Sequence, residues 1–220
     1  MKNISLKKVT ASTIISLMFL QIFYSVIIEP TTALATAVTN NVIVTLNVTS
    51  GVTISTGAAV TMLPNIGIAS NAAVGGSAWT VATNSATGYT LAVHSTTTPA
   101  LKNAAIDSFA NYTEAITGTP DLWGGVAAGT KEFGYGAYGT DTPTATWGTP
   151  TTCGNTSTGA PDVAGKFRGF TGTDVTIASR ATVTPTTGIT TNICFAAQQN
   201  ATYAAAGAYT ATVMATATAV

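Results

Sequence analysis

The stretch AWTVATNSATGYTLAV, residues 78–93, contains two runs in which apolar and small polar side chains alternate. In a β-strand, such alternation places the two kinds of side chain on opposite faces. The apolar side chains are Trp79, Val81, Tyr89, Leu91 and Val93. Residues 84–88 between the runs are turn-forming types, so the stretch predicts a β-hairpin. It contains no charged side chain, and the rest of the sequence must explain how such a hairpin stays soluble.

The 220-residue chain is 46% apolar and only 7% charged, whereas an ordinary soluble domain is roughly 25% charged. Thr, Ser, Asn and 21 glycines supply the remaining polar surface and the turns. Because β-branched Thr packs well on a pleated surface and Gly suits turns, this composition favours an all-β protein. The formal net charge is zero, so the chain has no basic field with which to bind nucleic acid.

The charges are confined to the middle of the chain. After residue 35, the first formally charged side chain is Lys102 and the last is Arg180. Residues 36–101 and 181–220 therefore contain no such side chain. Exposed strands at sheet edges are usually protected by Lys, Pro or inward charges, because their unpaired N–H and C=O groups recruit other chains. The two uncharged segments lack charged protection of this kind.

The beginning of the chain has the three parts of an export signal. Its basic residues are Lys2, Lys7 and Lys8. They precede an apolar run over residues 14–28, and the small residues at 33–35 offer a cleavage site. We therefore expect a signal peptide over residues 1–35, a mature domain over residues 36–220 without a membrane span, and a secreted or cell-surface location. An uncleaved membrane anchor is the alternative, although the run is shorter than the roughly 20 residues that span a bilayer.

Several further runs have the alternation and the flanking turn residues of short strands. They cover residues 41–55 (two runs), 132–138, 166–170, 175–183, 190–199 and 208–220. In the last run, the odd-numbered residues from Tyr209 to Ala219 share one face, and the even-numbered residues from Thr210 to Val220 share the other. Residues 103–116 are expected to form a short helix or a loop. About nine or ten short strands with Gly and Pro turns predict one domain, an all-β sandwich of the Greek-key type.

Two cysteines, Cys153 and Cys194, indicate a single disulfide formed in an oxidising compartment. Closing the loop between them would stabilise the fold by roughly 4 kcal/mol in the chain-entropy model. A zinc site is not expected, because zinc needs four ligands and His94 is the only histidine. A catalytic histidine needs a nucleophile and an orienting carboxylate. His94 lies between Val93 and Ser95, so it is interpreted as a histidine at a strand end.

The acidic residues are dispersed, and no pair is marked out for catalysis. We therefore expect no enzymatic activity, no cofactor and no metal site. Four of the acids lie in similar Gly- and Thr-rich turns: Asp121, Asp141, Asp162 and Asp174. Such turns either bind calcium weakly outside the cell or are ordinary Asx-turns, and the lack of a dedicated calcium-loop spacing favours Asx-turns.

Three aromatic side chains form a candidate platform for stacking on sugar rings: Trp123, Trp147 and Tyr138. Trp123 and Trp147 lie among Gly and Pro, a context typical of exposed loops. Trp79, by contrast, alternates with Val81 and is predicted to lie in the core. A carbohydrate-binding or adhesive module on the cell surface is therefore the alternative function that the sequence leaves open, with glycans as its partners.

The sequence GAYTATVMATATAV, residues 207–220, resembles the closing strand of secreted subunits of the fimbrial and spore-coat-protein-U kind, which often end in Gly-x-Tyr followed by alternating residues. AWTV and GYTLAV, within residues 78–93, are similar to bacterial surface domains of the WxL type, although no second Trp-x-Leu is present. The fimbrial resemblance implies an immunoglobulin-like sandwich whose subunits assemble when an N-terminal arm fills a groove in the next subunit. The cysteines lie later in this chain than is usual in fimbrial subunits.

These patterns together predict a non-enzymatic, exported structural protein. We expect it to assemble with copies of itself, or with related surface subunits, into a pilus, coat or surface layer. Strand addition at uncharged sheet edges is the expected mode of association. The candidate exchanged strand lies in residues 36–49, with Val42, Val44 and Leu46 facing the core of a neighbour. The other interpretation of this segment is the first strand of its own sandwich.

Overall fold

The computed structural model describes Met18, residues 43–103 and residues 107–220. The chain divides into two units, Met1–Asn47 and Val48–Val220. Apart from Met18, the predicted signal peptide lies outside the described residues. Among the described residues, no helix has the length and the apolar character that a membrane span requires.

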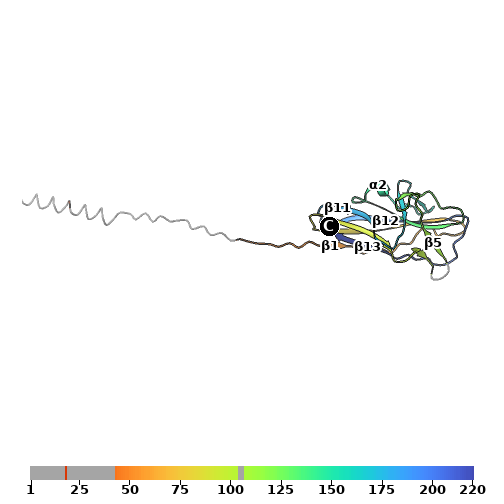
Figure 1. Ribbon diagram of the computed structural model, residues 1–220, viewed down its shortest axis with the longest axis horizontal. Coiled ribbons are helices and arrows are strands. Elements are labelled where there is room, and N and C mark those ends of the chain that lie inside the picture. Colours follow the sequence, from red (N-terminus) through yellow and green to blue (C-terminus); the bar gives the residue numbers. More distant parts are fainter. Residues whose placement is uncertain (1–17, 19–42, 104–106) are drawn as a thin grey trace, which may run out of the picture. The chain divides into compact units, whose positions relative to one another are not determined.

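The second unit consists of short β-strands and one turn of helix, α2 (Thr144–Trp147), as Figure 1 shows. The strands are β1 (Val52–Ile54), β2 (Ala72–Thr83), β3 (Tyr89–Ser95), β4 (Leu101–Lys102), β5 (Ser108–Asn111), β6 (Asp121–Leu122), β7 (Lys131–Gly139), β8 (Gly154–Asn155), β9 (Ala160–Pro161), β10 (Lys166–Gly169), β11 (Val175–Arg180), β12 (Ile189–Gln199) and β13 (Val213–Ala219). The predicted all-β class is confirmed. Residues 103–116, expected to be a helix or a loop, instead contain β5.

Among the described residues, the strands form three sheets. The large sheet has the order β1-β2-β12-β7-β10-β6, with β5 beside β7 and β4 beside β5. The small sheet has the order β11-β3-β13, and β8 pairs with β9. All of these pairs are antiparallel except the parallel pair of β5 and β7. The long strand β12 pairs with both β2 and β7, so it is the central strand of the large sheet.

The large and small sheets pack against each other around one apolar core. Alternate residues of five strands supply it: Trp79 and Val81 from β2, Tyr89, Leu91 and Val93 from β3, Phe133 and Tyr135 from β7, Ile177 from β11, and Ile193 and Phe195 from β12. All of these side chains are buried. Trp79 therefore lies in the core, as the sequence predicts.

The predicted hairpin over residues 78–93 is wrong, because its two strands belong to different sheets. β2 pairs with β1 and β12, whereas β3 pairs with β11 and β13. Residues 84–88 carry the chain across the core, where the apolar faces of the two strands meet. At this crossing, the N–H of Thr83 donates to Thr184 Oγ1 at 2.9 Å, and the Thr83 hydroxyl donates to the Gly51 carbonyl at 2.7 Å. Alternation with a period of two indicates which face of a strand is buried but leaves its partner open.

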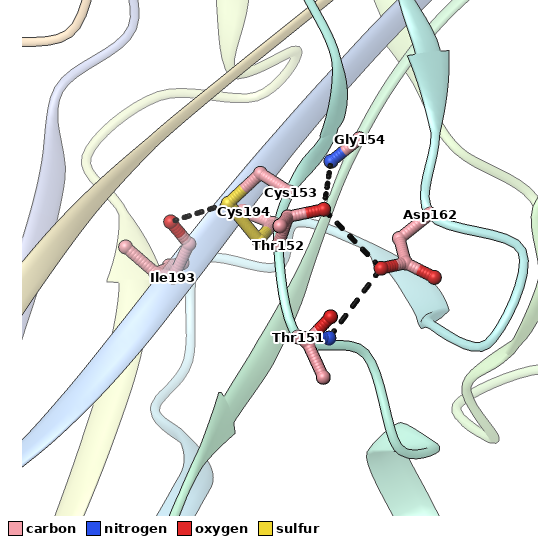
Figure 2. Close-up of a disulfide and its surroundings, with 7 residues drawn as sticks. All are labelled: Thr151, Thr152, Cys153, Gly154, Asp162, Ile193 and Cys194. Atoms are coloured by element: carbon pink, nitrogen blue, oxygen red, sulfur yellow. Dashed lines mark hydrogen bonds between the residues drawn. A yellow bond between two sulfur atoms is a disulfide. The ribbon is translucent and has the colours of Figure 1, made fainter.

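The outer face of the large sheet is covered by a second apolar cluster, which contains the disulfide. This outer cluster comprises Val74, Tyr112, Phe167, Cys194 and Ala196. Cys153 and Cys194 are bonded, which confirms the predicted disulfide (Figure 2). The loop that carries Cys153 approaches β2 closely because Gly76 has no side chain; a Cβ at this position would clash with Cys153 Sγ. The disulfide thus fastens that loop to the central strand β12.

Asp162 organises the loop around the disulfide (Figure 2). Its Oδ1 accepts the N–H of Ala164 at 2.9 Å, which is the Asx-turn predicted here. Its Oδ2 accepts the Thr152 hydroxyl at 3.3 Å and the Thr151 N–H at 3.4 Å. These hydrogen bonds, led by that of Ala164, lower the pKa of Asp162 below its usual value.

Candidate functional site

The two sheets meet along two seams, and the seam beside β11 is closed. The backbone carbonyl of Asp141 accepts the N–H of Ser179 in β11 at 3.0 Å. The Asp141 carboxylate accepts Arg180 Nη1 at 3.1 Å and the Tyr89 hydroxyl at 2.9 Å, and its side chain is only 7% exposed. Burial, followed by the bond to Asp141, raises the pKa of Tyr89 above its usual value. We call this arrangement the closed seam.

Trp147 fills the core near the segment that closes this seam. It is the last residue of α2, and its ring lies 5.5 Å from the ring of Tyr135, measured between centroids. Tyr135 in turn packs on Phe170 at 4.3 Å. Trp147 is 1% exposed. The prediction that Trp147 is exposed is therefore wrong, because α2 directs the indole into the core.

We call the seam beside β13 the open seam, because among the described residues neither a strand nor a loop backbone bonds the outer edge of β13, although β1 lies near it. On its inner side, β13 pairs with β3 in continuous register. The Thr96 N–H donates to the Thr212 carbonyl and the Val220 N–H donates to the Gly88 carbonyl, both at 3.1 Å. Bonded pairs alternate with unbonded ones in an antiparallel ladder, so the even-numbered residues bond β3. The odd-numbered residues direct their N–H and C=O groups to the free edge: Val213, Ala215, Ala217 and Ala219.

The side chains of β13 follow the same alternation. Those of the odd-numbered residues are half-buried, and Val213, Ala215 and Ala217 pack against the core, whereas those of the even-numbered residues are exposed. The division of faces predicted from the sequence is thus confirmed. A strand that bonded the free edge would extend the small sheet, and the side chains on its inner face would enter the open seam.

An uncharged groove of about 1160 Å³, lined by both apolar and polar side chains, lies in the open seam. Core residues of the large sheet form much of its floor: Trp79, Leu101, Phe109, Phe133 and Phe195. One wall consists of residues 57–68, and the other consists of residues 203–211 together with Val213 of β13. None of the described lining residues is Asp, Glu, Lys or Arg. We call this feature the seam groove.

The first wall, residues 57–68, runs against the inner face of β2. Gly57 lies on the indole of Trp79, where a Cβ would come within 2.7 Å of Nε1. The Ser77 hydroxyl of β2 donates to the Ala58 carbonyl at 3.0 Å. This wall is therefore fixed directly to the floor of the groove.

The second wall contains an alanine-rich strap, residues 203–209, which side chains from other elements hold in place. Gln199 lies at the end of β12 and is 2% exposed. Its Oε1 accepts the N–H of Ala204 at 2.8 Å, and its Nε2 donates to the Gly67 carbonyl at 3.0 Å. A single buried amide therefore connects the strap to the first wall.

Asp107 holds the strap at a second point. Its Oδ2 accepts the N–H of Ala205 at 2.8 Å and the hydroxyl of Tyr209 at 2.6 Å, and its Oδ1 accepts Lys131 Nζ. The bonds from Lys131 and Tyr209 are the main reasons why the pKa of Asp107 lies well below its usual range. Burial and the bond to Asp107 raise the pKa of Tyr209 to about 12. At neutral pH, Asp107 is thus an ionised anchor and Tyr209 a neutral donor.

Neither anchor of the strap is predicted from the sequence. Asp107 and Ala205 are 98 positions apart, and Gln199 and Gly67 are 132 positions apart. No local motif connects residues so distant along the chain. The signal that does mark the groove is the lack of charged side chains in the two segments that supply its walls.

The candidate exchanged strand is described in part, because Val42 lies outside the described residues. Val44 is 87% exposed and Leu46 is 83% exposed. Val48, the next residue on the same face of an extended chain, is 75% exposed. None of these three lies in a strand, and β1 begins only at Val52. Val44 and Leu46 therefore lie outside the first strand of the large sheet.

The three residues of the predicted glycan platform do not share a surface. Trp147 lies in the core between the sheets. Trp123 is half-buried, stacks on Tyr112 with centroids 4.4 Å apart, and donates its Nε1–H to Gln198 Oε1 at 2.7 Å. Tyr138 is half-buried and packs, like Trp123, against the outer cluster. The platform as predicted is therefore not assembled, since its members are divided between the two faces of the large sheet.

The other sequence candidates have partners in separate parts of the fold. Asp121 accepts the Tyr112 hydroxyl at 2.8 Å, and Asp174 Oδ1 lies 2.7 Å from His94 Nδ1 in β3. Asp121 also accepts the N–H of Ala115, so its partners lie only six and nine positions before it. Asp141 and Asp174 bond residues 39 to 80 positions away and therefore act as tertiary anchors, unlike the Asx-turn of Asp162.

Comparisons of the chain with protein-family models, with curated proteins and with solved structures found no match. The functional interpretation therefore depends on the geometry of the open seam itself.

Proposed function

We propose that this protein is an exported structural subunit that assembles with copies of itself by strand addition at the open seam. The segment around Val44 and Leu46 of one copy bonds the free edge of β13 in another copy and extends the small sheet. The observation that carries this proposal is the unpaired edge of β13 beside a groove without charged lining residues.

Strand addition supplies both affinity and specificity. The outward N–H and C=O groups of β13 would bond the incoming backbone, as in any antiparallel pair. Val44, Leu46 and Val48, which are 75–87% exposed in the single chain, would enter the seam groove. Complete burial of an aliphatic side chain of this size contributes roughly 1.5–3 kcal/mol before the cost of association is subtracted.

The lack of charge on both partners supports the proposal. No ion has to be desolvated when an uncharged segment enters an uncharged groove, and such desolvation costs several kcal/mol per ion. The charged residues that normally protect a free edge are missing from β13 and from the described walls of the groove. The lack of charged residues on β13 and on the groove walls therefore leaves a single molecule open to association and favours assembly through this edge.

The strand added to β13 is better supplied by a second copy of the protein than by the same chain. The Gly51 N–H donates to Asn84 Oδ1 at 2.7 Å, and Asn84 Nδ2 donates to the Thr49 carbonyl at 2.8 Å, so the chain enters β1 at the crossing between β2 and β3. β13 ends at the same crossing, where Val220 bonds Gly88. The chain's own segment would have to reverse there and run parallel to β13. A segment from another copy is free to add antiparallel, which is the more stable pairing.

We further propose that the two layers form a Greek-key sandwich of the immunoglobulin type. The connections from β2 to β3, from β10 to β11, from β11 to β12 and from β12 to β13 each pass from one sheet to the other, which supports this topology. The stretch that resembles the closing strand of fimbrial subunits contains β13, the strand with the free edge. Assembly into a pilus, coat or surface layer is consistent with these features.

Export is tested by the mass and the N-terminal sequence of protein recovered from the cell exterior. We expect a chain that begins near Thr36. Protein that is found only inside the cell, with Met1 retained, would contradict export.

Assembly is tested by a pair of substitutions in the donor segment. Leu46→Asp places a charge on the face that enters the groove, whereas Thr45→Asp places the same charge on the opposite face of the same extended segment. Both positions are exposed, so neither variant should lose its fold. We expect light scattering and electron microscopy to show assemblies for the wild-type protein and for Thr45→Asp, and single molecules for Leu46→Asp. Equal assembly by both variants, or single molecules for the wild-type protein at high concentration, would refute strand addition through this segment.

A further inference from the structure

The strap, residues 203–209, is weakly attached for a wall of the seam groove. Between Tyr203 and Tyr209 it contains only Ala and Gly, and Ala205, Ala206 and Ala208 are exposed. It therefore buries little apolar surface of its own. Segments with few buried apolar contacts open with a low free energy.

Its attachment depends on side chains that come from other elements. The N–H of Ala204 donates to Gln199 and the N–H of Ala205 donates to Asp107. Among the described residues, regular backbone pairing resumes at Thr210, which exchanges two bonds of 2.9 and 3.2 Å with Lys102. The strap thus spans two fixed ends and is held between them by hydrogen bonds to the Gln199 amide and the Asp107 carboxylate. We call these two anchors the latches of the strap.

The latch at Asp107 also fixes the aromatic end of the strap. The hydroxyl of Tyr209 bonds Asp107, and its ring meets Phe109 edge-on with centroids 5.3 Å apart. Phe109 is 3% exposed and lines the seam groove. Release of Tyr209 from Asp107 would therefore loosen the cover over this part of the groove floor.

We propose that the strap is a latched lid on the seam groove, and that its release from Asp107 and Gln199 controls the entry of the donor segment of a second copy. This inference rests on the proposed function, since it describes the regulation of the same groove. In the latched state, which the structure describes, the strap is one wall of the groove and holds the Tyr209 ring on Phe109, which narrows the groove and slows the entry of a donor segment. In the released state, the groove is wider and the donor segment has access.

Hydrogen exchange of the full chain tests the latch. Tyr209→Phe removes the hydroxyl that bonds Asp107 but keeps the ring on Phe109. Tyr203→Phe is the matched control, because Tyr203 is at the other end of the strap and is 66% exposed. We expect the amides of residues 204–208 to exchange about tenfold faster in Tyr209→Phe, the effect of losing one hydrogen bond to a charged group. Tyr203→Phe should exchange at the wild-type rate. Asp107→Asn, which weakens the same latch from the other side, should behave like Tyr209→Phe.

A second measurement separates the lid from the proposed function. The recipient is the Leu46→Asp chain, whose own donor segment is disabled, and the probe is a fluorescent peptide with the sequence of residues 40–49. We expect Tyr209→Phe in this recipient to raise the association rate of the peptide several-fold. If Tyr209→Phe left the amide exchange of the strap unchanged, or accelerated that exchange without accelerating peptide association, the proposal of a lid would be overturned. Failure of the peptide to bind any recipient would overturn strand addition itself, and the exchange rates would still report independently on the latch.

Discussion

The closed seam and the open seam lie at the two edges of one small sheet, and they differ in how the backbone of the edge strand is bonded. At the closed seam, Asp141 bonds β11 through its backbone and bonds Arg180 and Tyr89 through its carboxylate. At the open seam, the outer edge of β13 has no strand partner among the described residues, and the adjacent groove has no charged lining. The difference shows that the free edge of β13 and the lining of the groove are uncharged, whereas the ionised Asp107 and Lys131 hold the strap from outside that lining.

The physical reason is the cost of burying ions. A carboxylate that is 7% exposed is tolerated only when it is paired and hydrogen-bonded, as Asp141 is. Such a site stabilises one arrangement and excludes other chains. An edge that bonds another molecule, as we propose for β13, gains from the opposite chemistry, because neutral groups lose little free energy when water leaves.

The largest effect on stability should come from the core beside the closed seam. Trp147→Ala removes an indole that is 1% exposed and leaves a cavity against Tyr135. We expect the free energy of unfolding to fall by about 3–5 kcal/mol, as for other buried aromatic deletions. Urea unfolding followed by fluorescence or circular dichroism would measure this. A loss under about 1 kcal/mol would mean that Trp147 does not fill the core.

A smaller loss is expected at the ionic contact of the closed seam. Asp141→Asn keeps the shape of the side chain but removes the charge that Arg180 and Tyr89 bond. We expect the free energy of unfolding to fall by roughly 1–3 kcal/mol. Asp174→Asn is the control, because the side chain of Asp174 is 50% exposed and the loss of its bond to His94 should change stability by about 0.5 kcal/mol or less. Equal effects in the two variants would contradict the special role of Asp141.

The strap anchor Asp107 should make stability depend on pH. Its pKa is lowered in the folded state, mainly by Lys131 and Tyr209. Its stabilising contribution is therefore complete above its ordinary pKa of about 4 and is lost progressively as the pH falls below that value. We expect wild type to be more stable than Asp107→Asn at neutral pH, and we expect this difference to shrink under acid conditions. Chemical unfolding of both proteins at neutral and acid pH measures this difference in stability. A difference that grows in acid would contradict the lowered pKa of Asp107 in the folded state.

The smallest effect on folding should come from placing a charged side chain on the free edge strand β13. Ala215→Lys adds a charge on the half-buried side of β13, which packs against the core, and Thr216→Lys adds the same charge on its exposed side. We expect the free energy of unfolding to change by about 1 kcal/mol in Ala215→Lys and by about 0.5 kcal/mol or less in Thr216→Lys, while Ala215→Lys alone abolishes assembly. Light scattering of the two variants at matched concentration tests this. Assembly by Ala215→Lys would show that association uses another surface.

The sequence predicts faces better than partners. The alternation in β2, β3 and β13 correctly indicates which side chains are buried, since a period of two depends only on the strand itself. The partners of β2 and β3 could not be predicted, because they lie far along the chain: β2 pairs with β12, and β3 pairs with β11 and β13.

The candidate site was predictable to a similar degree. The sequence alone shows the two uncharged segments and the apolar alternation of Val44 and Leu46. The walls of the groove and the latch residues Asp107 and Gln199 are formed by long-range contacts that leave no local pattern. Trp147 was misjudged because Gly and Pro neighbours indicate a loop, and a loop can still insert a side chain into the core.

The most direct test of strand addition is a disulfide cross-link between copies. Chains with Leu46→Cys are mixed with chains that have Val213→Cys, Ala215→Cys or Ala217→Cys, and the mixtures are oxidised and separated by mass. We expect covalent dimers that contain one chain of each kind, with the strongest pair giving the register of the added strand. Absence of mixed dimers for all three positions, together with a cross-link that forms only inside a single chain when both cysteines are combined, would contradict the account.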